Sequence, residues 1–275
     1  MAYNNVLTIQ DISCVGQCSL TVALPIISAC GVETRVLPSA VLSTHTGGFK
    51  DYTFRDLTDD IPAIAAHWRA EGLRFGGLYT GYLGSAHQID HVITLLDSGL
   101  IEGAAIVDPA MADHGTLYPG FDDAFVETMK RLCAKADYLL PNLTEACLLT
   151  GTPYQASGDK AFIDGLLKKL LALGCKHVVM TGVSYDPQKT GIVVYDGESI
   201  FAYDHDKEPV TCYGTGDIFA SAFTGALLRG KTAADAATIA ADFTVRCVRE
   251  TAKHENHWYG TVFEPLIGSL CAMMK

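Results

Sequence analysis

The segment 210–230 carries the residues of this chain that are best suited to chemistry. It reads VTCYGTGDIFASAFTGALLRG, so Gly214, Thr215, Gly216 and Asp217 stand directly before a helical stretch of small and apolar residues. Glycines allow a tight turn in which successive backbone N–H groups and a helix N-terminus point at one place, and such a place binds an anion. An Asp in a first helical turn could instead only interact with the helix dipole, for about 0.3–1 kcal/mol. The segment alone leaves both interpretations open.

Polar residues also follow five predicted strands at their carboxyl ends. Ligands of open α/β sheets bind at this edge, so residues from separate strands are expected to meet in one site. Each of them alone could be an ordinary loop residue or a helix cap. The five residues are Asp11, Thr80, Asp108, Asn142 and Thr181.

The elements that hold these residues alternate between short apolar runs and longer amphipathic stretches, as in a parallel sheet covered by helices. Thr58 is the predicted N-cap of the helix in 57–72, and Pro25 should kink or shorten the first helix. Strands are expected within 6–10, 33–39, 75–85, 103–113, 136–151 and 175–182, and a hairpin within 191–204. Helices are expected at 19–30, within 57–72, at the end of 136–151, at 215–229 and 232–250, and after Thr261.

Length, charge and cysteine usage exclude several classes of protein. The 275 residues carry 20 Lys+Arg against 31 Asp+Glu, a formal net charge of −11, whereas nucleic-acid binding needs clustered basic residues. No secretory signal and no run of 18 apolar residues occur, which predicts a cytoplasmic protein without a membrane partner. The nine cysteines form no CxxC pair, so we expect most of them to be small, reduced core side chains. No repeat or linker divides residues 1–275, which predicts a single domain.

Seven sequence blocks, in order along nearly the whole chain, resemble the pyridoxal and pyridoxamine kinases of the ribokinase-like superfamily. They are VLTIQD (6–11), LSTHTGGF (42–49), LYTGYLGS (78–85), DPAMAD (108–113), LPNLTEACLLTG (140–151), VVMTG (178–182) and GTGDIFASAF (214–223). The resemblance implies an α/β fold, the ribokinase-like three-layer sandwich, with a mostly parallel central sheet, helices on both faces and no separate lid domain. It also implies a homodimer and an activity, the ATP-dependent phosphorylation of the 5′-hydroxymethyl group of pyridoxal, pyridoxine or pyridoxamine, the B6 vitamers.

The same resemblance implies catalytic roles in the segment 214–217. Asp217 corresponds to the general base that takes a proton from the substrate hydroxymethyl group. The amides of Gly214, Thr215 and Gly216 correspond to an anion hole for the γ-phosphate of ATP. Phosphoryl transfer depends mainly on positioning and on donors aimed at the phosphoryl oxygens, so these roles are physically coherent.

A second group matches the blocks that hold Mg²⁺ and ATP in the family. Asp108, Asp113 and Glu145, together with Asn142, would hold Mg²⁺ and its water shell against the nucleotide phosphates. Mg²⁺ keeps several waters, so contacts through water are as consistent with this pattern as direct ones. A solvated loop carboxylate is the alternative for each acid taken alone.

Thr181 and Gly182 match a block that contacts phosphate and, in many members, helps to define a monovalent cation site. Leu140 stands where the family often has a small polar residue. We therefore expect Mg²⁺ with ATP and leave a requirement for K⁺ open.

A third group would hold the vitamin ring. Thr46 and Tyr82 match positions that contact or cover the pyridine, although Tyr82 could also be a core aromatic residue. Asp11 departs from the family, because many pyridoxal kinases have Ser at this position. A carboxylate there could pair with a protonated ring nitrogen or a substrate amine, so we expect Asp11 to favour pyridoxamine or pyridoxine. Ser13 is a nearby donor for the ring hydroxyl.

Residues 44–56, named here the flap segment, combine two glycines with aromatic and charged residues and are predicted to cover the site. An ordinary surface loop is the alternative. We expect His45 to order this segment or to be a buried structural group. The residues HENHW (254–258) resemble a metal site only in composition, since adjacent spacing suits one ion poorly, and we predict a loop near the nucleotide.

Two other functions are alternatives. Hydroxymethylpyrimidine kinases share the scaffold, but they usually carry a GSDxxxGAG block after the first strand, which QDISCVGQCS (10–19) does not match. A non-catalytic vitamin- or nucleotide-binding protein would keep the fold and is expected to lose the base, whereas Asp217 is present.

Overall fold

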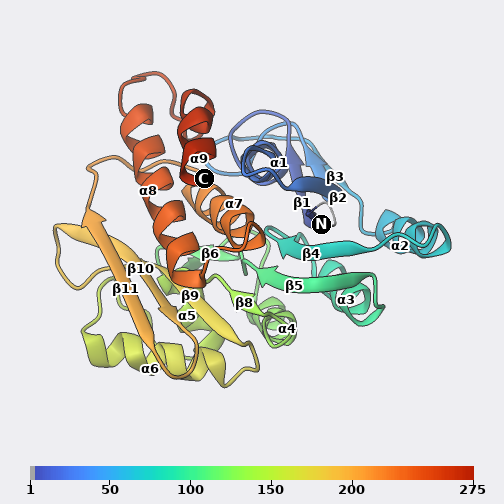
Figure 1. Ribbon diagram of the computed structural model, residues 1–275, viewed down its shortest axis with the longest axis horizontal. Coiled ribbons are helices and arrows are strands. Elements are labelled where there is room, and N and C mark those ends of the chain that lie inside the picture. Colours follow the sequence, from blue (N-terminus) through green and yellow to red (C-terminus); the bar gives the residue numbers. More distant parts are fainter. Residues whose placement is uncertain (1–3) are drawn as a thin grey trace.

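A computed structural model describes residues 4–275, and a nine-stranded sheet runs through its centre (Figure 1). In order across the sheet, the strands are β11 (Ile200–Asp206), β10 (Lys189–Tyr195), β9 (His177–Val183), β8 (Tyr138–Leu139), β5 (Ile101–Val107), β4 (Phe75–Thr80), β1 (Asn5–Ser13), β2 (Glu33–Leu42) and β3 (Phe54–Asp56). The strands from β9 to β2 pair in parallel, whereas β3, β10 and β11 are antiparallel to their neighbours. The parallel strands therefore end at one common edge, as the sequence predicts.

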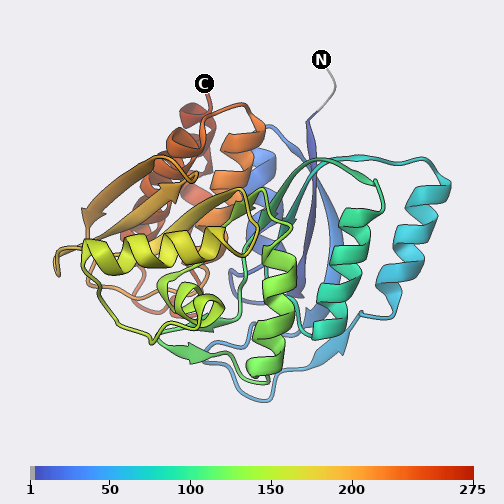
Figure 2. The same cartoon turned by 90° about the horizontal axis from the view of Figure 1, so that it is seen from below.

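Helices lie on both faces of this sheet (Figure 1). One face carries α2 (Asp60–Ala70), α3 (Ala86–Asp97), α4 (Asp123–Cys133), α5 (Leu143–Thr150) and α6 (Lys160–Leu171), which Figure 2 shows from below. The other face carries α1 (Leu20–Ala29), α7 (Thr215–Leu228), α8 (Ala233–Thr251) and α9 (Ile267–Met273), the last preceded by the 3₁₀ turn η1 (Glu264–Leu266). A two-stranded hairpin, β6 (Ala112–Asp113) and β7 (Thr116–Leu117), follows β5. The predicted three-layer α/β sandwich is confirmed, and residues 4–275 contain no separate lid domain.

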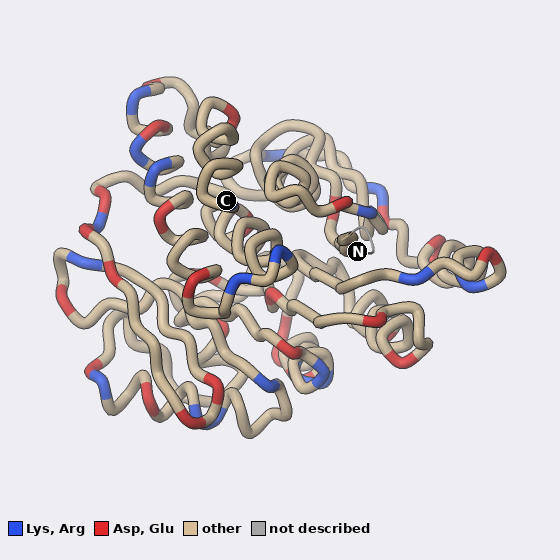
Figure 3. The backbone as a smooth tube through the Cα atoms, in the orientation of Figure 1, with Lys and Arg blue, Asp and Glu red and all other residues tan. Residues whose placement is uncertain are grey.

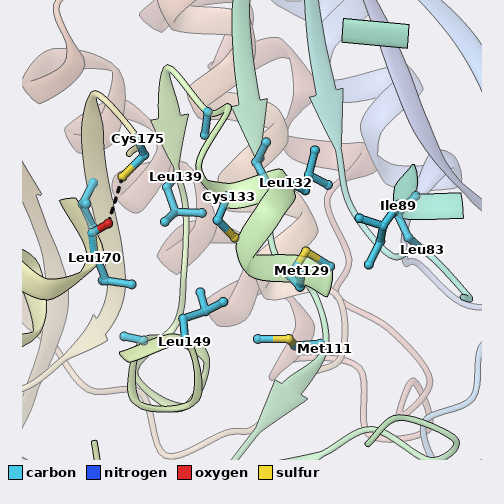
Figure 4. Packing of buried hydrophobic residues seen from close by; sticks show 14 of the residues in the cluster. Leu83, Ile89, Met111, Met129, Leu132, Cys133, Leu139, Leu149, Leu170 and Cys175 are labelled. Carbon is cyan, nitrogen blue, oxygen red and sulfur yellow. Dashed lines mark hydrogen bonds between the residues drawn. The ribbon is translucent and has the colours of Figure 1, made fainter. Parts of the chain in front are cut away.

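Two hydrophobic cores hold the three layers together. Leu7 and Ile9 of β1 face the core under α2–α6, whereas Val6 of the same strand faces the core under α1, α7 and α8. Both faces of the parallel strands are thus buried, which explains their nearly continuous apolar runs. Figure 4 shows part of the first core, where Met129 and Cys133 of α4 pack among leucines.

The cysteines mostly behave as small core side chains, as predicted. All nine are free thiols. Five of them are buried, namely Cys30, Cys133, Cys147, Cys175 and Cys247.

Helix α7 lies deep in the second core because its residues are small. Every residue from Ile218 to Ala226 is buried, and the helix packs on both α1 and α8. A Cβ atom at Gly225 would overlap the Cys30 thiol, so glycine is what allows α7 to approach α1 this closely. This packing fixes the N-terminus of α7 relative to that of α1.

Two local predictions are wrong. Thr58 does not cap α2, whose N-cap residue is Asp59; its hydroxyl instead donates to Asp56 at 2.6 Å and accepts from Gln88 at 2.9 Å. Pro25 lies inside α1, which continues to Ala29, so the predicted shortening is wrong, whereas the predicted kink stays a prediction. Helices α3, α4 and α6 and strand β3 are elements that the sequence prediction did not assign. The expectation about the start of the chain involves residues 1–3, which lie outside the described part.

Charged residues of both signs lie scattered over the helices and loops (Figure 3). Several of them form exposed pairs, such as Arg131 with Asp90 and Lys135 with Asp97. Among residues 4–275, no helix combines the length and the apolar character needed to cross a bilayer.

Candidate active site

The N-terminus of α7 is open to a ligand. Gly214 is its N-cap residue, with φ +81°, and no side chain caps the helix. A Cβ atom at this position would overlap the Gln17 carbonyl oxygen, so only glycine fits. The first helical hydrogen bond runs from the Ile218 N–H to the Gly214 carbonyl oxygen (3.0 Å). The preceding N–H groups, those of Thr215, Gly216 and Asp217, have no partner within the helix and can bind an anion.

Asp217 lies in the first turn of α7, enclosed by protein on most sides yet partly accessible to solvent. Burial raises the pKa of its carboxyl to about 7, the nearby Asp11 carboxylate acts in the same direction, and the Ser19 N–H opposes both by donating to Asp217. A carboxylate with a pKa near the working pH is a better base than an ordinary Asp. This position therefore combines a base with an anion site.

Asp11 lies in β1 beside Asp217 and is 4 % exposed. Its carboxylate accepts a hydrogen bond from the Ser13 hydroxyl at 2.8 Å and another from the Ser19 side chain. Burial raises the pKa of Asp11, and these hydroxyl donors offset part of the increase. Two buried carboxylates thus face one space, an arrangement that attracts a cationic group.

Two residues near these acids were not predicted as part of the site. Ser19, the N-cap residue of α1, has φ +54° and touches both Asp11 and Asp217. Burial and the same two carboxylates raise the pKa of the Cys18 thiol far above its usual range, so this thiol is protonated at neutral pH. Only their place between the first strand and the first helix could have indicated them.

Glu145 and Asn142 form a closed cap at the start of α5. The Asn142 side chain accepts from the Glu145 N–H (2.9 Å), and the Glu145 carboxylate accepts from the Asn142 N–H (2.9 Å), which is a capping box. The same two side chains reach the β6 region, where Glu145 accepts from the Met111 N–H (3.1 Å) and Asn142 donates to the Ala112 carbonyl oxygen (2.8 Å). Burial raises the pKa of Glu145 to about 8 despite these donors.

Asp108 follows β5 and lies between the two helix starts. Burial raises its pKa well above the ordinary value, and the Glu145 and Asp217 carboxylates raise it further. Asp113 is exposed on β6 and accepts from the His114 N–H at 2.8 Å. The Asp113 carboxylate in turn raises the pKa of Glu145, and the oxygens of these three acids are the donors that Mg²⁺ prefers. No three His, Cys, Asp or Glu side chains in residues 4–275 come together as direct ligands, so an ion held partly by water and phosphate fits this set.

The five strand-end residues converge as predicted. The Asp108 N–H donates to the Thr80 carbonyl oxygen (3.0 Å), and Asn142 forms a parallel bridge with Thr181. Asp217 links this group electrostatically to Asp11 on one side and to Asp108 on the other. Thr181 is half-buried at the end of β9, and Gly182 after it is exposed with φ +69°.

The predicted vitamin residues lie on the Asp11 side. Tyr82 is half-buried and stacks on Phe121 with ring centroids 5.6 Å apart, so it is not a fully buried core residue. Burial raises its pKa to about 12, and the Asp11 charge adds to this effect. Thr46 is exposed on the flap segment, next to the buried His45.

The flap segment is held at several points. Ser43 and Thr53 are bonded to each other at its base, and its last residues form β3, paired with β2. The 254–258 loop contacts the flap segment through Trp258, whose ring centroid is 4.7 Å from that of Phe49. Its expected place near the nucleotide stays a prediction.

Comparisons with known proteins agree with this geometry. Residues 27–262 match the family described as phosphomethylpyrimidine kinase. The chain is 29 % identical over 222 residues to the hydroxymethylpyrimidine/phosphomethylpyrimidine kinase of Bacillus subtilis, covering 79 % of this chain and 77 % of that protein. Among solved structures, a Bacteroides thetaiotaomicron protein assigned to the phosphomethylpyrimidine kinases, crystallised with pyridoxal, is 34 % identical with a TM-score of 0.92, covering 98 % of this chain and 96 % of that one. Pyridoxal kinase from Lactobacillus plantarum is 32 % identical with a TM-score of 0.91, covering 99 % and 98 %.

Fold and site together define a kinase of the ribokinase-like superfamily, with the resemblance to its pyridoxal kinases confirmed. Within that class, the chain belongs to the phosphomethylpyrimidine kinase family. Members of this group that resemble the chain are named for pyrimidine or for B6 substrates, so the family leaves the acceptor to be decided by the site.

Proposed function

We propose that the protein is an ATP-dependent kinase that phosphorylates the 5′-hydroxymethyl group of pyridoxal, pyridoxine or pyridoxamine, with residues 1–275 forming one kinase domain. The observation that carries this proposal is the position of Asp217, a base at an uncapped helix N-terminus and beside a second buried acid, Asp11. Transfer of a phosphoryl group to an alcohol needs a base next to an anion hole. The pyridoxal bound in the Bacteroides protein and the likeness to the Lactobacillus pyridoxal kinase support the choice of acceptor.

In the proposed reaction, Asp217 accepts the hydroxymethyl proton while the new O–P bond forms and the bond between the γ-phosphorus and ADP breaks. The amides of Gly214, Thr215 and Gly216 stabilise the charge on the transferred phosphoryl group. The proton ends on the Asp217 carboxylate, and the phosphoryl group ends on the vitamer oxygen. Thr181 and Gly182, at the same sheet edge, would contact the phosphates of ATP.

Mg²⁺ bound with ATP would neutralise phosphate charge. Asp108 would hold its water shell from the end of β5, Glu145 from the start of α5, and Asp113 from the β6–β7 hairpin. The repulsion between these carboxylates, which contributes to the raised pKa values of Asp108 and Glu145, would be relieved by a bound cation. Leu140 is buried in the core and offers no side-chain ligand for K⁺, so the proposal includes Mg²⁺ alone. A homodimer stays a prediction from the resemblance, and a cytoplasmic location stays a prediction from the sequence composition.

On the vitamin side, we propose that Asp11 receives a cationic group of the substrate. A buried carboxylate is costly to charge unless a partner arrives, so binding a protonated ring nitrogen or amine would be favoured here. Ser13 holds the carboxylate in place and would donate to the ring hydroxyl when available. Tyr82 and Thr46 would cover the ring from the β4 side and the flap segment.

Hydroxymethylpyrimidine kinase activity is the second candidate, favoured by the family match and by the Bacillus subtilis relative. Both substrates present a hydroxymethyl group on a nitrogen heterocycle, so the base and the anion hole would serve either one. The residues that differ lie at the end of β1 and in the loop after it, where the segment 10–19 does not match the block usual in pyrimidine kinases. The acceptor therefore depends on the vitamin side of the site.

The deciding experiment is an ADP-release assay with ATP, Mg²⁺ and a panel of acceptors: the three B6 vitamers, hydroxymethylpyrimidine and simple sugars. We expect turnover with at least one vitamer and a lower kcat/KM for the pyrimidine. Turnover with the pyrimidine and with none of the vitamers would contradict the B6 kinase proposal and favour hydroxymethylpyrimidine kinase activity. ATP binding without any transfer would favour a non-catalytic binding protein.

A further inference from the structure

His45 joins three segments that are far apart in the sequence. Its side chain is 5 % exposed. Its Nδ1 atom accepts from the Gly47 N–H (3.0 Å), and Nε2 lies 2.6 Å from the Tyr259 carbonyl oxygen. A carbonyl oxygen only accepts, so Nε2 carries the proton and Nδ1 carries none. The His45 N–H also donates to the Val15 carbonyl oxygen (3.2 Å), so a neutral ring ties the flap segment to the loops after β1 and before η1.

Aromatic rings surround this histidine and form what we call the aromatic latch, the residues His45, Phe49, Tyr213, Trp258 and Tyr259. The His45 ring centroid is 5.1 Å from that of Phe49 and 5.1 Å from that of Tyr213. Phe49 in turn packs on Trp258, with centroids 4.7 Å apart. Such pairs contribute beyond the area they bury, so the flap segment is docked by specific ring contacts.

Three glycines make room for these rings. A Cβ atom at Gly16 would overlap the His45 ring, and one at Gly47 would overlap the Tyr213 ring. At Gly48 a Cβ atom would lie 2.9 Å from the Trp258 ring. A larger residue at any of these three positions would therefore force a ring of the latch to shift.

The latch ends at the first residue of the anion hole. Tyr213 directly precedes Gly214, and its carbonyl oxygen accepts from the Thr261 hydroxyl at 2.6 Å. On the other side, the Gln17 carbonyl oxygen packs against Gly214, and Gln17 is bridged to Gly260. The loops that His45 connects are thus the same loops that enclose the start of α7.

We propose that His45 is a positioning residue of the kinase reaction, because the aromatic latch couples the place of the flap segment to the place of the anion-hole amides. This inference rests on the proposed function. Thr46, the residue expected to meet the vitamin, neighbours His45 in the chain. When the flap segment docks on the vitamin, the latch then holds Tyr213 and Gly214 in place, so that the anion-hole amides meet the γ-phosphoryl group. His45 itself touches neither substrate.

The test uses the full chain with Trp68→Phe, which leaves Trp258 as the sole tryptophan of the two in the sequence. Trp68 lies in α2 against Phe75 and takes no part in the latch, so this background keeps it intact. His45→Asn keeps an acceptor near Nδ1 and loses the bond to Tyr259. His45→Gln keeps an N–H donor near Nε2 and loses the bond from Gly47. Lys50→Ala, an exposed change in the same segment, is the control.

Both His45 variants should lower kcat at least about tenfold, since small displacements of catalytic groups are costly. Their Kd for MgADP should change less than about threefold, because the nucleotide contacts themselves are kept. In the parent, MgAMP-PCP, a non-hydrolysed ATP analogue that carries a γ-phosphoryl group, should change the Trp258 emission, and in the His45 variants this response should be lost. The Lys50→Ala control should match the parent in all three measurements.

An unchanged kcat in both His45 variants would overturn the inference, as would a parent whose Trp258 emission does not respond to bound MgAMP-PCP. A kcat loss that only follows the loss of folded protein, measured by thermal melting, would reduce His45 to a structural role. Should the His45 variants not fold, Gly47→Ala displaces the Tyr213 ring without touching the imidazole and must give the same kcat loss. If MgADP does not bind the parent at all, it is the proposed kinase function that fails first.

Discussion

Two helices begin at the same edge of the sheet, and their N-termini are treated in opposite ways. At α5 the side chains of Asn142 and Glu145 occupy the first amides, and Glu145 also holds the loop before β6. At α7 the N-cap is Gly214, which has no side chain, and the first amides stay open. A helix N-terminus carries a partial positive charge that favours an anion in either case. The N-terminus of α5 is thus capped by side chains of the protein itself, whereas the N-terminus of α7 is free to bind a ligand.

A third helix start explains how the open one is equipped. Helix α1 also lacks a side-chain cap, and its Ser19 N–H donates to Asp217 of α7. The carboxylate that accepts from the N-cap residue of α1 is therefore the base of the proposed reaction. At α5 and α1 a carboxylate of the chain accepts from the N-cap N–H, whereas at α7 the amides of the first turn lie beside the proposed base.

The largest effect is expected from Asp217→Asn, which removes the base and leaves the amides in place. We expect kcat to fall at least about 10²-fold, in line with the loss of a general base, while MgATP still binds. Because burial raises the pKa of Asp217 to about 7, kcat/KM of the parent should also fall as the pH drops below about 7. Steady-state kinetics over pH 5.5–9 with equilibrium binding checks both. Near-normal turnover in the variant would remove Asp217 from the mechanism.

The same substitution should stabilise the protein at high pH. The folded pKa of Asp217 lies above its unfolded value, so the folded state holds the proton longer and stability is lost as the pH rises from about 4 to about 7. Asn carries no such penalty, so its advantage in Tm should be about 2–5 °C greater at pH 8 than at pH 5. Thermal melting without Mg²⁺ measures this difference. An advantage that does not grow with pH contradicts the assigned cause.

Gly214→Ala tests whether the open terminus needs its glycine. The new Cβ atom would overlap the Gln17 carbonyl oxygen and force a shift of the loop, so we expect kcat to fall about 10–10²-fold. Gly230→Ala, at the other end of α7, is the matched control, because Gly230 also has positive φ (+86°) but no atom within 4 Å of the new Cβ. The control should lose only about 1–2 kcal/mol of stability, the cost of a left-handed residue. Equal kinetics in the two variants would show that strain alone, and not the position of the amides, matters.

The sequence predicted what local patterns encode and missed what distant residues decide. Gly214 and Asp217 stand out because a glycine turn before a small-residue helix is a local signal. Thr58 was misassigned as a cap because Gln88, which lies 30 positions further along the chain, competes for its hydroxyl. The packing of Trp258 on Phe49 joins residues more than 200 positions apart, and no spacing rule predicts such a contact.

The burial of the acidic residues in the site could not be predicted from the sequence either. Asp11 and Asp108 were recognised as site residues by their place after strands, but their raised pKa values follow from enclosure by several elements at once. Ser19 became visible only through its positive φ and its two acidic neighbours. The sequence thus predicted which residues belong to the site, whereas their raised pKa values depend on neighbours that only the fold brings together.

Asp11→Ser and Asp11→Asn test whether the buried acid on the vitamin side of the site selects among the vitamers. Both remove the buried charge, and Asn keeps the shape of the side chain that accepts from Ser13. The kcat/KM for pyridoxamine and pyridoxine relative to pyridoxal should fall about 5–10-fold, the size of one partly desolvated charge contact. The three vitamers are compared at fixed MgATP. Unchanged ratios would show that Asp11 does not select among them.

The smallest effect is expected at the closed terminus. Asn142→Ala removes the cap of α5 and the bond to the Ala112 carbonyl oxygen, so the free energy of unfolding should drop by about 1–2 kcal/mol. Asp159→Ala removes the exposed cap of α6, which accepts only from the Phe162 N–H, and should cost about 0.5–1 kcal/mol. Urea unfolding compares the two. If Asn142→Ala costs no more than Asp159→Ala, the double use of Asn142 adds nothing, and the contrast between the closed start of α5 and the open start of α7 would rest on α7 alone.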